Sequence, residues 1–155
     1  MVICDAQYFS NGLTSLNAIA YDSFDLIFSQ AVLEHVRRYE FLDTMRECHR
    51  VLKRDGVASH RVDLKDHLGG NLNNLRFKES LWESDFFFKS GFYTNRIRFS
   101  EMLALIEKAG FCISEVRVDR WDRSPINRTK LSKDFASVTD DDLLVKGFDI
   151  LFLPA

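Results

Sequence analysis

The stretch FDLIFSQAVLEHV, residues 24–36, decides the fold. Its first part, Phe24 to Phe28, is short, apolar and rich in β-formers, as is typical of a buried parallel strand. The polar pair Ser29 and Gln30 follows, and Ala31 to Val36 has the character of a short helix. This order of strand, polar end and helix indicates an α/β protein.

The sequence on either side continues the pattern. Apolar residues at three- and four-residue spacing predict two helices, at Tyr39 to Lys53 and at Ser100 to Ala109. We expect Ser100 to cap the second helix, and Gly56 and Gly110 to end the two helices. Further strands are predicted at Val2 to Cys4, Val57 to Leu64, Cys112 to Val118 and Val145 to Leu153. Strands that alternate with helices predict a parallel sheet with crossover helices.

Composition narrows the class of protein. The chain has 155 residues, of which 46% are hydrophobic, and a net charge of −2, which suits one domain with a real core. This charge balance gives no reason to expect a nucleic-acid partner or a membrane partner. No apolar run approaches the roughly 20 residues that span a bilayer. The three cysteines are odd in number and far apart, which favours a reducing cytoplasm.

The segment 66–95 interrupts the pattern. It contains Gly69-Gly70, Trp82, the run Phe86-Phe87-Phe88 and four asparagines. A long insertion that mixes aromatic and amide side chains is uncommon as a plain connection. It leaves the carboxyl end of a predicted strand, where open α/β sheets bind ligands. We therefore expect this insertion to lie on the substrate side of a binding cleft.

Several stretches together resemble class I S-adenosylmethionine-dependent methyltransferases of the type 11 group. Residues 24–36 are similar to the fourth-strand motif of that family. Met45 to Gly56 resembles its E-x-x-R-V-L-K-x-G-G turn, with Val57 in place of the second glycine. Ala109-Gly110-Phe111 resembles the turn into the sixth strand, and His60 to Leu68 and Tyr93 to Arg98 are similar to one bacterial branch.

The resemblance implies a Rossmann-like sheet with strands in the order 4-5-7-6 and an antiparallel last strand. It also implies that residues 1–155 form an N-terminally truncated domain lacking the first two strands, because no two of the seven glycines have the family's G-x-G spacing. Residues 1–20 would then be a remnant of strand three and a linker, poorly anchored. The apolar edge of Phe24 to Phe28 would be bare, which invites self-association.

By the same resemblance, the cofactor is S-adenosylmethionine. Asp5 and Ala6 correspond to the pair that meets the adenine, and Ser29 and Gln30 to residues lining the cofactor cleft. The alternatives are an ordinary aspartate in a turn for Asp5 and a helix cap for Ser29.

Three residues are candidates for catalysis. His35 could contact the substrate or act as a general base, and Asp63 with His67, four residues apart, could take a proton from the methyl acceptor. The alternatives are a structural histidine and a loop hydrogen-bond network. Tyr93, Asn95 and Arg96 are expected to shape a pocket for a polar acceptor. We predict no metal site, although His60, Asp63 and His67 could be imagined as ligands, because no cysteine or glutamate has a compatible spacing.

The function implied is methyl transfer to a small or glycan-like acceptor. A catalytically silent fragment or a protein-interaction module on a methyltransferase scaffold is the alternative. A nucleic-acid-binding module is disfavoured by the lack of net basic charge.

Overall fold

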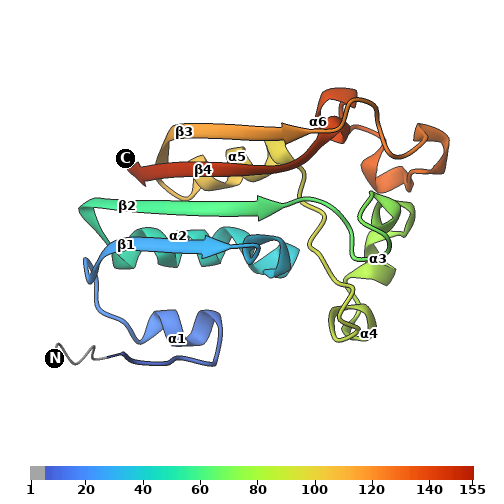
Figure 1. The fold of residues 1–155 in the computed structure, drawn as a ribbon. Coiled ribbons are helices and arrows are strands. Elements are labelled where there is room, and N and C mark those ends of the chain that lie inside the picture. The colour runs from blue at the N-terminus through green and yellow to red at the C-terminus, as the bar shows by residue number, and fades with distance from the viewer. Residues whose placement is uncertain (1–5) are drawn as a thin grey trace, which may run out of the picture.

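A four-stranded sheet forms the centre of the molecule (Figure 1), in a computed structural model that describes residues 6–155. The strand order is β1-β2-β4-β3. β1 (Phe24–Gln30) runs parallel to β2 (Leu52–Asp63), whereas β4 (Val145–Pro154) runs antiparallel to both β2 and β3 (Phe111–Arg120). The last strand of the chain thus lies between β2 and β3, in the order that the family resemblance implied. The parallel sheet predicted from alternating strands and helices is correct for β1 and β2 only, because β4 runs antiparallel to both of its neighbours.

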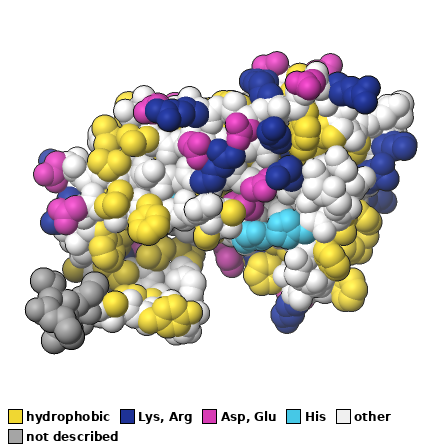
Figure 2. Space-filling model, in the orientation of Figure 1, with side chains coloured by type: hydrophobic (Ala, Val, Ile, Leu, Met, Phe, Trp, Pro, Cys, Tyr) yellow, Lys and Arg dark blue, Asp and Glu magenta, His cyan; other side chains and the backbone are white. Residues whose placement is uncertain are grey.

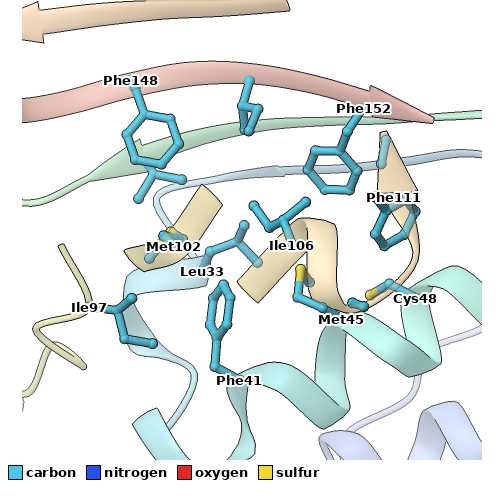
Figure 3. Close-up of a cluster of buried hydrophobic side chains, with 14 of the residues drawn as sticks. Leu33, Phe41, Met45, Cys48, Ile97, Met102, Ile106, Phe111, Phe148 and Phe152 are labelled. Atoms are coloured by element: carbon cyan, nitrogen blue, oxygen red, sulfur yellow. The ribbon is translucent and has the colours of Figure 1, made fainter. Parts of the chain in front are cut away.

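Two amphipathic helices build the main core against the sheet. α2 (Phe41–Val51) contributes Phe41 and Met45, and α5 (Phe99–Lys108) contributes Met102 and Ile106, all completely buried. Figure 3 shows these side chains meeting residues of β4 and the start of β3. Burying each side chain of this size is worth about 2 kcal/mol, so this layer supplies much of the fold's stability.

The remaining elements are short. The helices are α1 (Leu13–Asn17), α3 (Glu79–Trp82), α4 (Asp85–Phe88) and α6 (Asp140–Leu144). The 3₁₀ helices are η1 (Leu33–His35), η2 (Arg38–Glu40), η3 (Asn73–Arg76), η4 (Arg128–Lys130) and η5 (Lys133–Phe135). Among the described residues, no helix has the length and apolarity needed to cross a membrane.

The end of α2 differs from the prediction. The helix stops at Val51, and Leu52 already belongs to β2 and pairs with Phe24 of β1. Gly56 therefore does not end the helix. A Cβ at Gly56 would lie 2.8 Å from the Leu52 side chain and 2.9 Å from the carbonyl oxygen of Lys53, so glycine is required there by close packing.

The start of α5 also differs, because its cap comes from another helix. The Asp142 carboxylate in α6 accepts hydrogen bonds from the Ser100 amide, at 3.1 Å, and from the Ser100 hydroxyl. Ser100 lies inside the helix, which begins at Phe99. Gly110 does end α5 as predicted, with a φ of 104°.

The N-terminal part is more structured than the sequence suggested. The expected strand Val2 to Cys4 lies outside the described residues. Within the stretch expected to be poorly anchored, α1 contacts α2, and the Arg50 side chain donates to the carbonyl groups of Leu16, at 2.8 Å, and Ile19, at 2.7 Å.

β1 carries a row of exposed apolar side chains. Leu26 is 54% exposed and Phe28 is 75% exposed, and the described residues pair this strand with β2 alone. Figure 2 shows hydrophobic side chains gathered on this part of the surface. The apolar pattern alone predicted a buried strand, whereas the family resemblance implied a bare edge, and among the described residues β1 is an edge strand.

Candidate functional site

The candidate site lies where β1 and β2 end. Because the two strands are parallel, their carboxyl ends meet at one edge of the sheet. The insertion with α3 and α4 lies beyond this edge, as Figure 1 shows. Figure 2 shows histidine side chains at the surface in the same region, between the sheet and the insertion. The insertion therefore lies beyond the carboxyl ends of β1 and β2.

His35 and His67 come together at this edge. Their ring centroids are 5.1 Å apart, although the residues belong to η1 and to the loop after β2. Nδ1 of His35 lies 2.9 Å from the carbonyl oxygen of Tyr93, and Nδ1 of His67 lies 3.4 Å from that of Gly91. A carbonyl only accepts, so in each ring Nδ1 carries the proton. In a neutral ring Nε2 then has a free lone pair, as a general base requires.

The carboxylate of Asp63, the last residue of β2, interacts with Lys65 and not with the histidines. Its carboxylate accepts a hydrogen bond from the Lys65 amide at 2.9 Å and pairs with the Lys65 ammonium group at 3.3 Å. The structure therefore places Asp63 in the site and directs its carboxylate to Lys65. The hydrogen bonds of His67 and Asp63 run to different partners, so they form no direct pair.

The residues expected to line the cofactor cleft lie at the end of β1. The Ser29 hydroxyl is 2.7 Å from Nδ1 of His60, a buried histidine of β2. Gln30 is exposed and ends the strand. Ala31 has a φ of 52°, in the left-handed region that a residue with a Cβ rarely adopts, so the chain turns sharply here. Such strained positions cluster at binding sites.

This strand end fits one side of a nucleoside cofactor. The exposed Gln30 side chain makes no hydrogen bond within the described residues, and the chain turns sharply at Ala31. Asp5 lies outside the described residues, and Ala6 is exposed with no regular structure. The described residues thus supply the exposed Gln30 side chain and a sharp turn of the backbone, which is a partial fit to such a cofactor.

Tyr93, Asn95 and Arg96 are buried beneath the histidines. The Tyr93 hydroxyl donates to the Glu83 carboxylate at 2.8 Å, and burial raises its pKa above the ordinary range. The Asn95 amide donates to the carbonyls of Leu33 and Val36, at 2.9 Å each, and so holds the loop that carries His35.

Arg96 is anchored in the insertion. Its guanidinium group donates to the carbonyl of Phe77 at 2.8 Å and lies over the rings of Trp82, at 5.3 Å, and Phe135, at 4.8 Å. Burial lowers its pKa to about 10, a range in which it keeps its charge at neutral pH. Tyr93 thus contacts both His35 and the insertion, Asn95 holds the loop of His35, and Arg96 holds the insertion.

Sequence reasoning missed Glu34. This residue is 2% exposed, and burial raises its pKa to about 7. One oxygen of its carboxylate accepts from the Asp63 amide at 3.3 Å. The signal in the sequence was a single charge inside the apolar run from Ala31 to Val36.

The sequence suggested for His60 only a weakly supported role as a metal ligand. It is buried, and its ring stacks on Phe152 with centroids 5.2 Å apart. Burial lowers its pKa to about 4, so the ring is neutral at pH 7. No group of three or more potential metal ligands occurs among residues 6–155.

The comparison of sequences identifies a domain family over part of the chain. Residues 5–59 match the family described as methyltransferase domain. No curated protein sequence gives a significant match.

Solved structures share the fold. An S-adenosylmethionine-dependent methyltransferase from Methanosarcina mazei is 19% identical with a TM-score of 0.57, and the match covers 88% of this chain and 62% of that one. A methyltransferase of the same kind from Archaeoglobus fulgidus is 11% identical with a TM-score of 0.52, covering 93% of this chain and 65% of that one. The [4+2]-cyclase SpnF is 14% identical with a TM-score of 0.51, covering 87% and 51%.

The chain spans between 51% and 65% of the length of these three proteins. At such low identities the likeness establishes the fold, and the cyclase shows that this fold also serves other reactions. Residues 5–59 thus match a methyltransferase-domain family, and the chain shares its fold with S-adenosylmethionine-dependent methyltransferases.

Proposed function

We propose that the protein transfers a methyl group from S-adenosylmethionine to a hydroxyl group of a small or glycan-like acceptor. The observation that carries this proposal is the pair His35 and His67 at the carboxyl edge of a methyltransferase sheet, with each Nδ1 fixed by a backbone carbonyl. A fixed Nδ1–H leaves Nε2 as the basic atom. His35 has the shorter bond of the two and is the proposed base.

The cofactor, when bound, supplies an electrophilic methyl group on a sulfonium sulfur. His35 would accept at Nε2 the proton that the acceptor hydroxyl loses as its oxygen bonds to the methyl carbon, whose bond to the sulfonium sulfur breaks at the same time with its electron pair going to sulfur. The Tyr93 carbonyl holds the ring in the tautomer that can accept this proton, and it stabilises the imidazolium that results. His67 lies against His35 and limits the positions that an acceptor hydroxyl can take.

The other predicted residues take supporting roles in this proposal. Ser29 and Gln30 line the cofactor side of the cleft, together with Asp5 and Ala6 on the adenine side. Tyr93, Asn95 and Arg96 hold the acceptor side from beneath, which is supported by the hydrogen bonds of Tyr93 and Asn95 to the loop of His35 and by that of Arg96 to the insertion. Asp63 contributes a negative charge next to Lys65 at the mouth of the site.

The first experiment is calorimetric titration of the purified protein with S-adenosylhomocysteine. We expect saturable one-to-one binding that Gln30→Ala weakens about five- to tenfold, because one hydrogen bond to the ligand is lost. Absence of binding would refute the assignment of the cofactor.

The second experiment measures transfer of a labelled methyl group to a panel of mono- and oligosaccharides. His35→Asn keeps a donor for the Tyr93 carbonyl but removes the base, and should lower the rate about 100-fold or more. His49→Asn is the matched control, because His49 packs on Phe111 outside the site. Equal rates for the two variants would exclude His35 as the base.

A second candidate function is protein interaction through β1, which the exposed Leu26 and Phe28 favour. An open apolar strand edge can pair with another chain, including a second copy. Sedimentation velocity should then show association that depends on concentration and that Phe28→Lys abolishes. Phe86→Lys, at an equally exposed phenylalanine of α4, is the control and should leave association unchanged.

A further inference from the structure

Glu34 joins three segments beneath the candidate site. It belongs to η1, directly before His35. Its backbone carbonyl accepts from the Asn95 amide at 2.7 Å, and its carboxylate accepts from the Asp63 amide at 3.3 Å. Through these two bonds it connects the loop after β1, the end of β2 and the segment before α5.

The second carboxylate oxygen of Glu34 is buried and has no hydrogen-bond partner. Glu34 also lines a cavity of about 10 Å³, together with Asp63, Asn95, Arg96 and Arg98. Such a volume holds one water molecule at most. Atoms of a cofactor or an acceptor cannot enter, so Glu34 acts through its neighbours and does not touch the substrate.

The charged groups around Glu34 have both signs. Asp63 and His67 face it from the end of β2 and the loop that follows, Arg96 and Arg98 from the segment before α5, and His35 is its neighbour in η1. The two guanidinium groups direct their hydrogen bonds to backbone carbonyls and leave the Glu34 carboxylate without a direct ion pair.

We propose that Glu34 is a positioning residue that makes the acceptor site sensitive to pH near neutrality. When ionised, it holds the Asp63 amide firmly and places a negative charge beneath the histidines. That charge stabilises the imidazolium formed as the acceptor loses its proton. When protonated, Glu34 loses both effects. This inference rests on the proposed function for its catalytic consequence, whereas the titration itself belongs to the ligand-free protein.

Burial without a cationic partner is the physical cause. It disfavours the charged carboxylate and raises the pKa of Glu34 to about 7, from an ordinary value of 4.5. The carboxyl is therefore protonated at pH 5.5 and ionised at pH 8.5. Methyl transfer should rise with pH across this interval, and Glu34→Gln should remove the part of the rise that Glu34 causes.

The test uses the Asp63 amide as a reporter in the ligand-free protein. Its chemical shift, followed by ¹H–¹⁵N NMR from pH 5 to 9, should move with a midpoint near 7, because an amide proton shifts when its acceptor ionises. In Glu34→Gln that step should vanish, although all four histidines remain. Glu107→Gln, on the exposed side of α5, is the matched control and should keep the step. The same step in Glu34→Gln would overturn the proposal.

A second measurement tests the proposal even if the Glu34→Gln variant fails to fold. The side-chain carboxyl carbon of Glu34 in the wild-type protein, assigned through its own backbone, can be titrated directly by ¹³C NMR. A midpoint near 7 supports the proposal, and a midpoint near 4.5 refutes it. Neither measurement involves methyl transfer. The titration of Glu34 can therefore be confirmed even if the protein transfers no methyl group, and methyl transfer can be confirmed even if Glu34 does not titrate near pH 7.

Discussion

Two buried groups of opposite character should make opposite, pH-dependent contributions to the stability of this protein. Burial lowers the pKa of His60 from 6.5 to about 4, and burial raises the pKa of Glu34 from 4.5 to about 7. Both side chains are almost fully enclosed, at 4% and 2% exposure. Their titrations therefore fall in the same interval between about pH 4 and 7.

The two contributions have opposite signs. The unfolded chain protonates His60 below pH 6.5 while the folded chain does not, so the stability due to neutral His60 is lost as pH falls toward 4. Glu34 contributes stability that is fully present below pH 4.5 and is lost as pH rises through 7. Each shift corresponds to about 3 kcal/mol. In the wild type, the two effects should largely cancel.

Single variants separate the two effects. Between pH 7 and pH 4.5, Glu34→Gln should lose about 3 kcal/mol of unfolding free energy, and His60→Leu should gain about 3 kcal/mol, while the wild type stays nearly constant. Urea unfolding followed by the fluorescence of Trp82 and Trp121 measures all three proteins. Comparing each protein with itself at two pH values removes the direct cost of the substitution.

Ser29→Ala is the control for the His60 variant. It removes the hydrogen bond to the ring but leaves His60 buried, so the wild-type pH dependence should persist. Parallel curves for the wild type, Glu34→Gln and His60→Leu would refute the reasoning, because they would show that neither buried group titrates away from its ordinary range.

Three further substitutions test the packing around the site. Gly110→Ala should destabilise the fold by about 2 kcal/mol in urea unfolding, because the φ of 104° is strained for alanine and its Cβ would lie 3.1 Å from the His49 ring. Asn95→Ala should cost about 3 kcal/mol and increase amide hydrogen exchange around His35, because two carbonyls and one amide lose their partner. Arg98→Leu should prevent stable folding, seen as lost protection from hydrogen exchange, because three buried carbonyl groups lose their donor.

The sequence predicted the layers of the fold well, because hydrophobic periodicity is local. The apolar positions of α2 and α5 are those that face the sheet, and the order of strands followed from the family resemblance. The ends of these helices were predicted less well. α2 ends where Leu52 pairs with Phe24, and α5 is capped by Asp142, so both ends depend on residues distant in the chain.

The candidate site, too, could be predicted from the sequence only in part. His35 and His67 were found by residue type, and the structure brings their rings together. The proximity of Glu34 to Asn95 could not be predicted, because their hydrogen bond joins positions 61 residues apart. Whether a charged residue is buried depends on such contacts, and therefore no local pattern identifies it.

The segment 93–98 shows why these buried polar residues matter for function. It has no regular secondary structure, yet every residue in it is buried. Its position is set by side chains: Asn95 binds the loop of His35, Arg96 binds the insertion, and Arg98 binds the ends of β2 and α6. The carbonyl that orients His35 belongs to Tyr93, the first residue of this segment. The geometry of the proposed base thus depends on polar side chains in the core, and substitutions at Asn95 should alter the orientation of His35 before they alter the sheet.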